Sequence, residues 1–229
     1  MAVSESYGQD RGGKHDHLVE SLVGGLAPVR RLPPPSLRAV AWFAAALGLG
    51  ILLMPMADME GMRTRMSVPD LRVAALAAVL TAATAALAAF QISVPGRSLR
   101  WVLLPVVPAI LWIGASGLGC LRGIVAPTTD IPGPREVESC FVFLIGVSLP
   151  LSVLLVVMLR RACPLRPNLT AALGGLAAAA AAAALLVPFH PHDTTVTDLL
   201  IHMLAVGAVI GLNSLAGGRL LTGKGAPPR

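Results

Sequence analysis

The chain has 229 residues, of which 55% are hydrophobic and 13% are charged, and its mean hydropathy is +0.75. Soluble domains carry about 25% charged residues, so this composition excludes an ordinary soluble domain and indicates a bundle of membrane helices. The formal net charge is +6, but the sequence contains no long run of Lys or Arg. The charge therefore argues against direct binding of nucleic acid and for basic loops at a membrane surface.

Residues 1–38 are polar and are predicted to form a segment outside the membrane. Between His15 and Ala27, apolar residues recur with the spacing of one helix face, namely Leu18, Val19, Leu22, Val23 and Leu26. Asp16 is expected to cap the start of this helix, and Pro28 is expected to end it. An amphipathic helix without a domain of its own is expected to bind a groove of another protein or the membrane plane.

A basic, proline-rich joint connects this helix to the first apolar stretch. It begins with Val29, Arg30 and Arg31 and continues through three consecutive prolines at 33–35. Consecutive prolines favour a stiff, extended backbone. The arginines, together with Arg38, are typical of a positive-inside anchor at the cytoplasmic face.

Six apolar stretches are long enough to cross a bilayer, which takes about 20 residues. They cover residues 39–57, 71–92, 101–119, 141–159, 169–187 and 199–215. The predicted fold class is therefore an all-α polytopic membrane protein, a six-transmembrane-helix bundle that follows a short amphipathic helix. The expected division is an N-terminal segment (1–38), the transmembrane domain (39–217) and a tail (218–229).

The distribution of basic residues predicts the orientation of this bundle. Thirteen of the 18 Lys and Arg residues fall in the N-terminal segment, the second and fourth loops and the tail, and the other loops and their flanks hold five. Basic residues accumulate in cytoplasmic loops, so both termini are predicted to lie in the cytoplasm. The first, third and fifth loops are then on the outer side.

With this topology, Cys120 at the end of the third stretch and Cys140 at the start of the fourth both lie on the outer side. A disulfide between them would close a loop of about 20 residues and contribute about 3 kcal/mol. Three alternatives stay open: a static structural bridge, two unrelated buried thiols, or a redox switch in an oxidising compartment.

The last outer loop contributes His190 and His192. Thiolate and imidazole are preferred ligands of zinc and related ions, so Cys140, His190 and His192 are candidate ligands of a transient soft or transition metal ion. The alternative is that the two histidines are simply solvated. No other cofactor is expected.

The apolar stretches contain little that points to catalysis or transport. His202 is the one ionisable residue inside them apart from Arg72 at the edge of the second, and a structural, hydrogen-bonded histidine is favoured over a proton path. Gly207 and Gly211 form a GxxxG pair, for which packing within the chain is favoured over a homodimer. No nucleotide-binding, nucleophile or metalloprotease motif occurs, so no enzymatic activity is expected.

Several short motifs, taken in order, resemble a known family. They are LAPVRRL at residues 26–32 before the prolines, Cys140 at the head of the fourth stretch, RRACPLRP at residues 160–167 and the His-Pro-x-Asp stretch at residues 190–193. From about His17 to Leu221 the chain resembles the NrsF-like membrane anti-sigma factors. The resemblance implies a cytoplasmic N-terminus followed by six helices in the bacterial inner membrane.

The resemblance also implies function. Such proteins hold an extracytoplasmic-function sigma factor at the membrane and release it under stress, which makes Leu18, Leu22, Leu26, Val29, Arg30 and Arg31 the candidate partner-binding residues. Family members carry two outer sensing cysteines, and here His190 stands at the second position. Either Cys120 replaces that partner, or Cys140 and His190 form a mixed metal site, or sensing is altered. A small transporter and a membrane-assembly subunit are the alternative functions.

Overall fold

The computed structural model describes residues 6–25, 31–125, 134–162, 164–189 and 196–221. The chain divides into two units, Met1–Leu32 and Pro33–Arg229. The first helix of the second unit begins at Pro35. The expected boundary after residue 38 separates the N-terminal segment from the transmembrane domain and stays a prediction.

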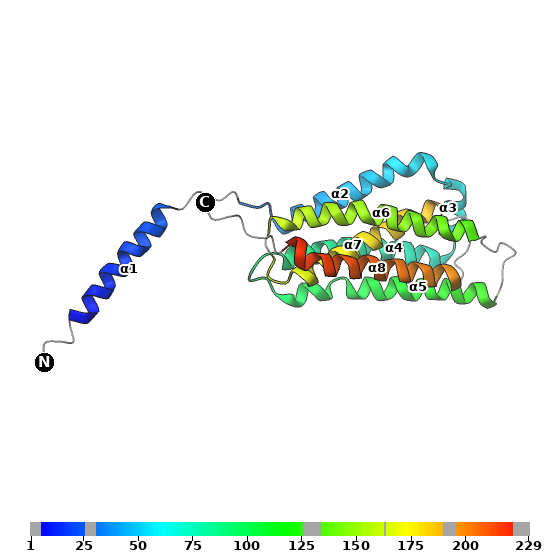
Figure 1. Ribbon diagram of the computed structural model, residues 1–229. Helices are drawn as coiled ribbons and strands as arrows, with labels where there is room; N and C mark the ends of the chain where they lie inside the picture. Colours follow the sequence, from blue (N-terminus) through cyan, green and yellow to red (C-terminus); the bar gives the residue numbers. More distant parts are fainter. Residues whose placement is uncertain (1–5, 26–30, 126–133, 163, 190–195, 222–229) are drawn as a thin grey trace. The chain divides into compact units, whose positions relative to one another are not determined.

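The first unit contains helix α1 (Ser6–Gly24) (Figure 1). The predicted amphipathic helix is present, but it starts well before the expected cap at Asp16, which lies inside the helix. The apolar stripe occupies only the second half of α1, and apolar periodicity cannot detect a polar first half. The helix ends at Gly24, before Pro28, which lies outside the described residues.

Within its described residues, the second unit is a bundle in which six helices are long and apolar enough to cross a membrane, as predicted. These helices are α2 (Pro35–Leu53), α4 (Pro69–Ile92), α5 (Val106–Val125), α6 (Pro134–Arg160), α7 (Pro167–Leu186) and α8 (Val196–Leu221). Short 3-10 helices cover Met54–Met56, Leu99–Leu103 and Val187–Phe189. A short helix, α3 (Met59–Met66), joins α2 to α4.

Proline marks the first residue of four of the long helices, α2, α4, α6 and α7. The first N–H groups of a helix have no intrahelical acceptor, and proline fixes the backbone angle that a helix needs. Proline therefore begins these helices without losing a hydrogen bond. Pro150 differs from these four prolines, because it lies in the interior of α6 and not at the start of a helix.

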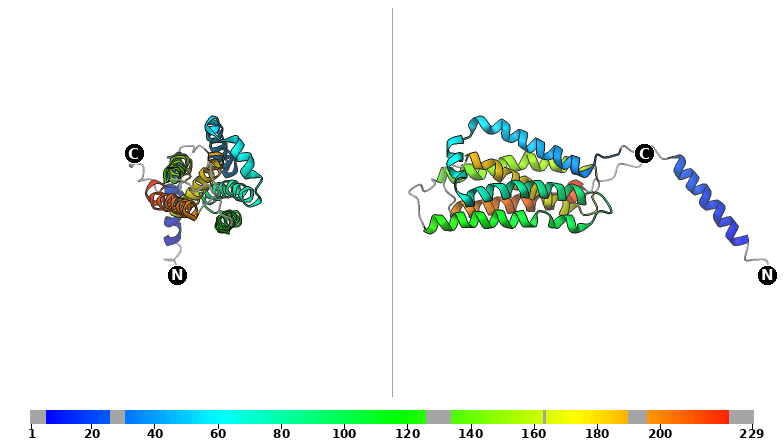
Figure 2. Two further views of the ribbon diagram at one scale, coloured as in Figure 1. Left: turned by 90° about the vertical axis from the view of Figure 1, so that its right-hand side faces the viewer. Right: turned by 180° about the vertical axis from the view of Figure 1, so that it is seen from behind.

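Helix α7 occupies the centre of the bundle and packs against α4, α6 and α8 (Figure 2). Its run of alanines between Ala177 and Ala182 is almost completely buried. A Cβ atom on Gly175 would lie 3.0 Å from the Ile210 Cα and 3.1 Å from the Val209 carbonyl oxygen, both on α8. Small side chains therefore let the neighbouring backbones approach α7 closely, as in other membrane bundles.

The long helices alternate in direction, which gives the bundle two ends (Figure 1). The basic end contains the start of α2, residues 93–98, the loop between α6 and α7, and the end of α8. The opposite end contains α3, the start of α4 and the end of α7. The loops and helix ends rich in Lys and Arg therefore lie at one end of the bundle, and those with fewer lie at the other end, as the predicted topology requires.

Helix α3 closes the opposite end and was not predicted. Asp58 caps it by accepting a hydrogen bond from the Gly61 N–H at 3.0 Å. The Asp58 N–H donates to the Pro188 carbonyl at 3.0 Å, and the Arg65 guanidinium donates to the Val187 carbonyl at 3.2 Å. These bonds attach α3 to the end of α7.

The expected role of the GxxxG pair in α8 is wrong. A Cβ atom on Gly207 or Gly211 would meet no atom of the described residues within 4 Å, so neither glycine makes a close contact with them. Gly175 and Gly217 make the close approach between α7 and α8 instead. The spacing of two glycines does not specify which face of the helix a neighbour covers.

Candidate functional site

The apolar stripe of α1 is exposed. The exposed fractions are 56% for Leu18, 57% for Val19, 63% for Leu22 and 58% for Val23. Residues three and four apart lie next to one another on a helix, so these side chains form one continuous face. The described part of this unit offers no surface that covers the stripe.

The structure places only some of the candidate partner-binding residues. Leu18 and Leu22 lie on α1, and Arg31 is exposed just before the bundle. Leu26, Val29 and Arg30 lie outside the described residues. Within the α1 unit, the structure therefore describes the candidate partner-binding surface mainly through the apolar stripe on α1.

Arg38, in the first turn of α2, makes a contact that the sequence analysis missed. Its side chain is 6% exposed, and its guanidinium donates a hydrogen bond to the Met158 carbonyl oxygen near the end of α6. The guanidinium carbon also lies 4.8 Å from the centre of the Phe90 ring, in cation–π geometry. The last carbonyl groups of a helix lack intrahelical donors and favour a cation, so Arg38 caps the end of α6.

Trp42 reinforces this contact one turn further along α2. It is fully buried, and its indole N–H donates to the Leu151 carbonyl oxygen at 3.1 Å. Because residues four apart share a helix face, Arg38 and Trp42 both face α6. An arginine and a tryptophan four residues apart at the start of an apolar stretch were the available signal for this contact.

The candidate sensing cysteines are both buried at the opposite end. Cys140 lies early in α6 with 5% of its surface exposed, and Cys120 lies late in α5 with 7% exposed. Cys120 is a free thiol, so the structure holds no bridge between the two residues.

The two helices that carry these cysteines have different main packing partners. Helix α5 packs against α4 and touches α8, whereas α6 packs against α2, α7 and α8. In both figures α5 and α6 lie on different sides of the bundle (Figures 1 and 2).

The structure places one of the three candidate metal ligands, so the metal site stays a prediction. His190 and His192 lie outside the described residues. Among the residues that are described, no three His, Cys, Asp or Glu side chains gather closely enough to hold a metal ion. Cys140 is therefore the member of the candidate set that the structure places.

A family model described as NrsF, negative regulator of sigma F, matches residues 22–222. The matched region begins at Leu22 on the α1 stripe and extends through all six long helices. This match confirms the resemblance found in the sequence. No curated protein and no solved structure matches the chain.

Proposed function

The chain belongs to the NrsF family of negative regulators of sigma F, and we propose that it is an anti-sigma factor that holds its sigma factor at the membrane. The observation that carries this proposal is the exposed apolar stripe of α1, which includes Leu18 and Leu22. We further propose that the partner is an extracytoplasmic-function sigma factor. The membership itself implies negative regulation of a sigma factor.

The stripe suits recognition of a helix by a groove. An amphipathic helix presents side chains at positions i, i+4 and i+8 to an apolar groove of its partner, and Leu18, Leu22 and Leu26 have this spacing. Full burial of one such side chain contributes roughly 1.5–3 kcal/mol. Arg30 and Arg31 follow the stripe in sequence and would contact acidic groups at the edge of that groove.

The proposed location is the bacterial inner membrane, with the basic end and both termini in the cytoplasm, where a sigma factor is available. The distribution of Lys and Arg supports this orientation. Accessible cysteines test it in a Cys163→Ser background. An impermeant thiol reagent should label Ser67→Cys in spheroplasts and should label Arg97→Cys only after the membrane is permeabilised. The reverse pattern would contradict the orientation.

Binding is tested with the full chain. The sigma factor should copurify with the wild-type protein and should be lost with Leu22→Asp, which places a charge in the stripe. His17→Asp is the matched control, because it adds the same charge to the other face of α1, where His17 is exposed. Equal capture by both variants, or capture of no sigma factor by the wild type, would contradict the proposal.

The proposed signal is an oxidant or a soft metal ion acting at Cys140 on the outer side, together with Cys120 or His190. Helix α6 supports a connection between this position and the cytoplasm. Cys140 and Met158 lie on the same helix, roughly 27 Å apart at 1.5 Å per residue, and the Met158 carbonyl accepts the bond from Arg38. A displacement of α6 would change this bond and thereby the start of α2, which follows the sigma-binding segment.

Alkylation followed by mass spectrometry tests this signal. Oxidant treatment of cells should lower the labelling of Cys140 in the denatured protein and should release the sigma factor. Cys140→Ser should then retain the sigma factor under oxidant. Full labelling of Cys120 and Cys140 before and after treatment would contradict the redox switch.

A further inference from the structure

A small apolar cluster at the basic end of the bundle brings three exposed arginines together. Trp101, from the 3-10 helix before α5, and Leu169, from the first turn of α7, both pack against this cluster. Arg97 and Arg100 lie just before Trp101 in the chain, and both are exposed. Arg166 lies three residues before Leu169 and is also exposed. The buried residues of the cluster are Ala88, Ala89, Ile92 and Leu173.

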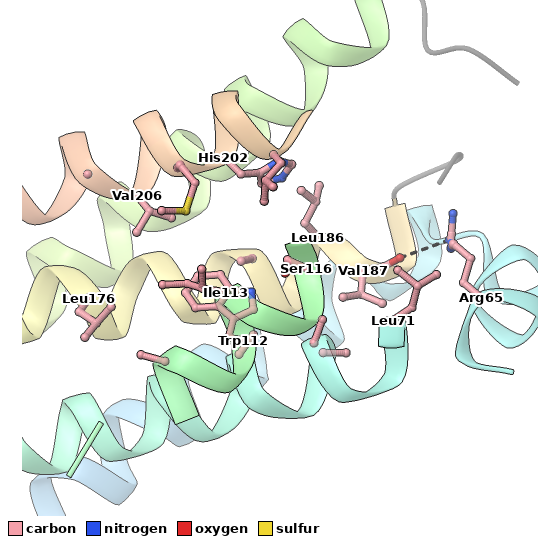
Figure 3. A pocket seen from close by; sticks show the side chains of 18 of the residues that line it. Arg65, Leu71, Trp112, Ile113, Ser116, Leu176, Leu186, Val187, His202 and Val206 are labelled. Atoms are coloured by element: carbon pink, nitrogen blue, oxygen red, sulfur yellow. Dashed lines mark hydrogen bonds between the residues drawn. The ribbon is translucent and has the colours of Figure 1, made fainter. Parts of the chain in front are cut away.

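These three arginines have no acidic partner in the described part of the chain. The sequence contains no Asp or Glu in residues 71–129 or 139–192, which include the segments that carry them. Among the described residues, their guanidinium groups make no hydrogen bond, ion pair or ring contact. The opposite end differs, because Arg122 pairs there with Asp70 and Arg65 donates to the carbonyl that follows α7 (Figure 3). The three positive charges at the basic end therefore suit an anion from outside the chain.

The surroundings of these arginines indicate where that anion lies. Leu99 and Leu103 belong to the same 3-10 helix as Arg100, and both are exposed. The third membrane-spanning segment already begins at Leu99, so Arg100 lies at the end of a span. Arginine and tryptophan at such ends lie at the level of the lipid headgroups. A phospholipid matches both features, because its phosphate faces the cations and its acyl chains face the leucines.

We propose that the arginine site, formed by Arg97, Arg100 and Arg166, binds an anionic phospholipid in preference to a zwitterionic one. The phosphate would accept charge-assisted hydrogen bonds from the guanidinium groups. Basic residues near a membrane surface attract anionic lipids, whereas the ammonium group of a zwitterionic lipid is repelled by them. The proposal requires the basic end to lie at a membrane surface, but it requires neither the sigma factor nor one orientation. Its failure would therefore leave the proposed function untouched.

Trp101 provides the readout in the full-length protein. Replacement of the other two tryptophans, Trp42→Phe and Trp112→Phe, leaves Trp101 as the sole tryptophan of the chain. Bromine quenches a tryptophan that it contacts, so a small fraction of brominated lipid in phosphatidylcholine vesicles reports which lipid lies beside Trp101. Brominated phosphatidylglycerol should bind at least about fivefold more tightly than brominated phosphatidylcholine. Equal quenching by the two lipids would overturn the proposal.

If this variant does not fold, the part of the wild-type quenching that Trp101→Phe removes gives the same comparison. Two matched variants then test whether the preference is local. Arg97→Gln with Arg100→Gln should lower it to less than about twofold. Arg160→Gln with Arg161→Gln removes the same charge at the end of α6, which packs on α2, α7 and α8, and should leave it unchanged. An equal loss in both variants, or full retention in the first, would overturn the site.

Arg166→Gln tests the contribution of the second segment. It should lower the preference for phosphatidylglycerol about twofold or more, and an unchanged preference would overturn the joint site. Copurification of the sigma factor tests an acidic protein as the partner instead. If lipid preference is absent and Arg97→Gln with Arg100→Gln abolishes capture of the sigma factor, the assignment to a lipid is wrong.

Discussion

The apolar side chains of α1 are exposed, whereas the charged side chain of Arg38 at the start of α2 is buried. Both features reverse the usual distribution of residues between surface and interior. Arg38 is satisfied within the chain by the Met158 carbonyl and the Phe90 ring. The stripe on α1 finds no cover within the described part of its own unit, so its partner must be sought elsewhere. Arg38 therefore stabilises the bundle, and the stripe on α1 is available for binding.

The largest effect is expected for Arg38→Ala. This variant removes the donor at the end of α6 and the cation over Phe90, and we expect a loss of about 3 kcal/mol in the free energy of unfolding. Unfolding in mixed micelles, followed by circular dichroism, measures it. Arg97→Ala, an exposed arginine at the same end, should change stability by less than about 0.5 kcal/mol. If the two variants are equally stable, the burial of Arg38 contributes nothing.

Truncation of the α1 stripe should affect binding and leave the bundle intact. Leu18→Ala should lower affinity for the sigma factor by about tenfold, because a buried anchor side chain is lost. Biolayer interferometry on the full chain measures the Kd, and the same unfolding assay should show unchanged stability. A fall in stability with no change in Kd would mean that the stripe packs within the chain.

Trp42→Phe should have a smaller effect than Arg38→Ala. The phenyl ring still fills much of the buried site, and the loss is mainly the hydrogen bond to the Leu151 carbonyl, which is worth about 1 kcal/mol. The unfolding assay checks this value. A loss as large as that of Arg38→Ala would show that shape, not the cap on α6, holds α2 in place.

The smallest effect is expected at the opposite end, where Arg122 pairs with Asp70 at 2.6 Å. The Arg122 side chain is 38% exposed, so solvent screens this pair, and Asp70→Asn should cost no more than about 0.5 kcal/mol. The loss of stability caused by Asp70→Asn should be smaller still in high salt, because salt screens the interaction between the two charges. A large loss that salt does not reduce would remove the contrast between this partly exposed pair and the buried Arg38.

The sequence predicted the six long helices because a continuous apolar run of about 20 residues forms few structures other than a membrane-spanning helix. It did not predict α3, which is short and polar and is held by its cap at Asp58 and its bonds to residues 187 and 188. The role of Arg38 was also missed. An arginine before an apolar run has the same pattern whether it extends to the membrane surface or caps a neighbouring helix.

The candidate site, too, could be predicted only in part from the sequence. Periodicity located Leu18 and Leu22 on one helix face, because that face follows from spacing alone. The relation between Cys120 and Cys140 did not follow, since hydropathy gives the end of the bundle but not the order of helices around α7. The open space beside Gly207 could not be predicted for the same reason, because the sequence does not specify which helix packs beside this glycine.

The central claim is that the α1 stripe contacts the sigma factor directly. The most direct test places a photo-crosslinking amino acid at Leu22 or at His17 of the full-length chain, in cells that contain the sigma factor. We expect a crosslinked product with the sigma factor from position 22 and little or none from position 17. Absence of a product at position 22, or equal products at both positions, would contradict it.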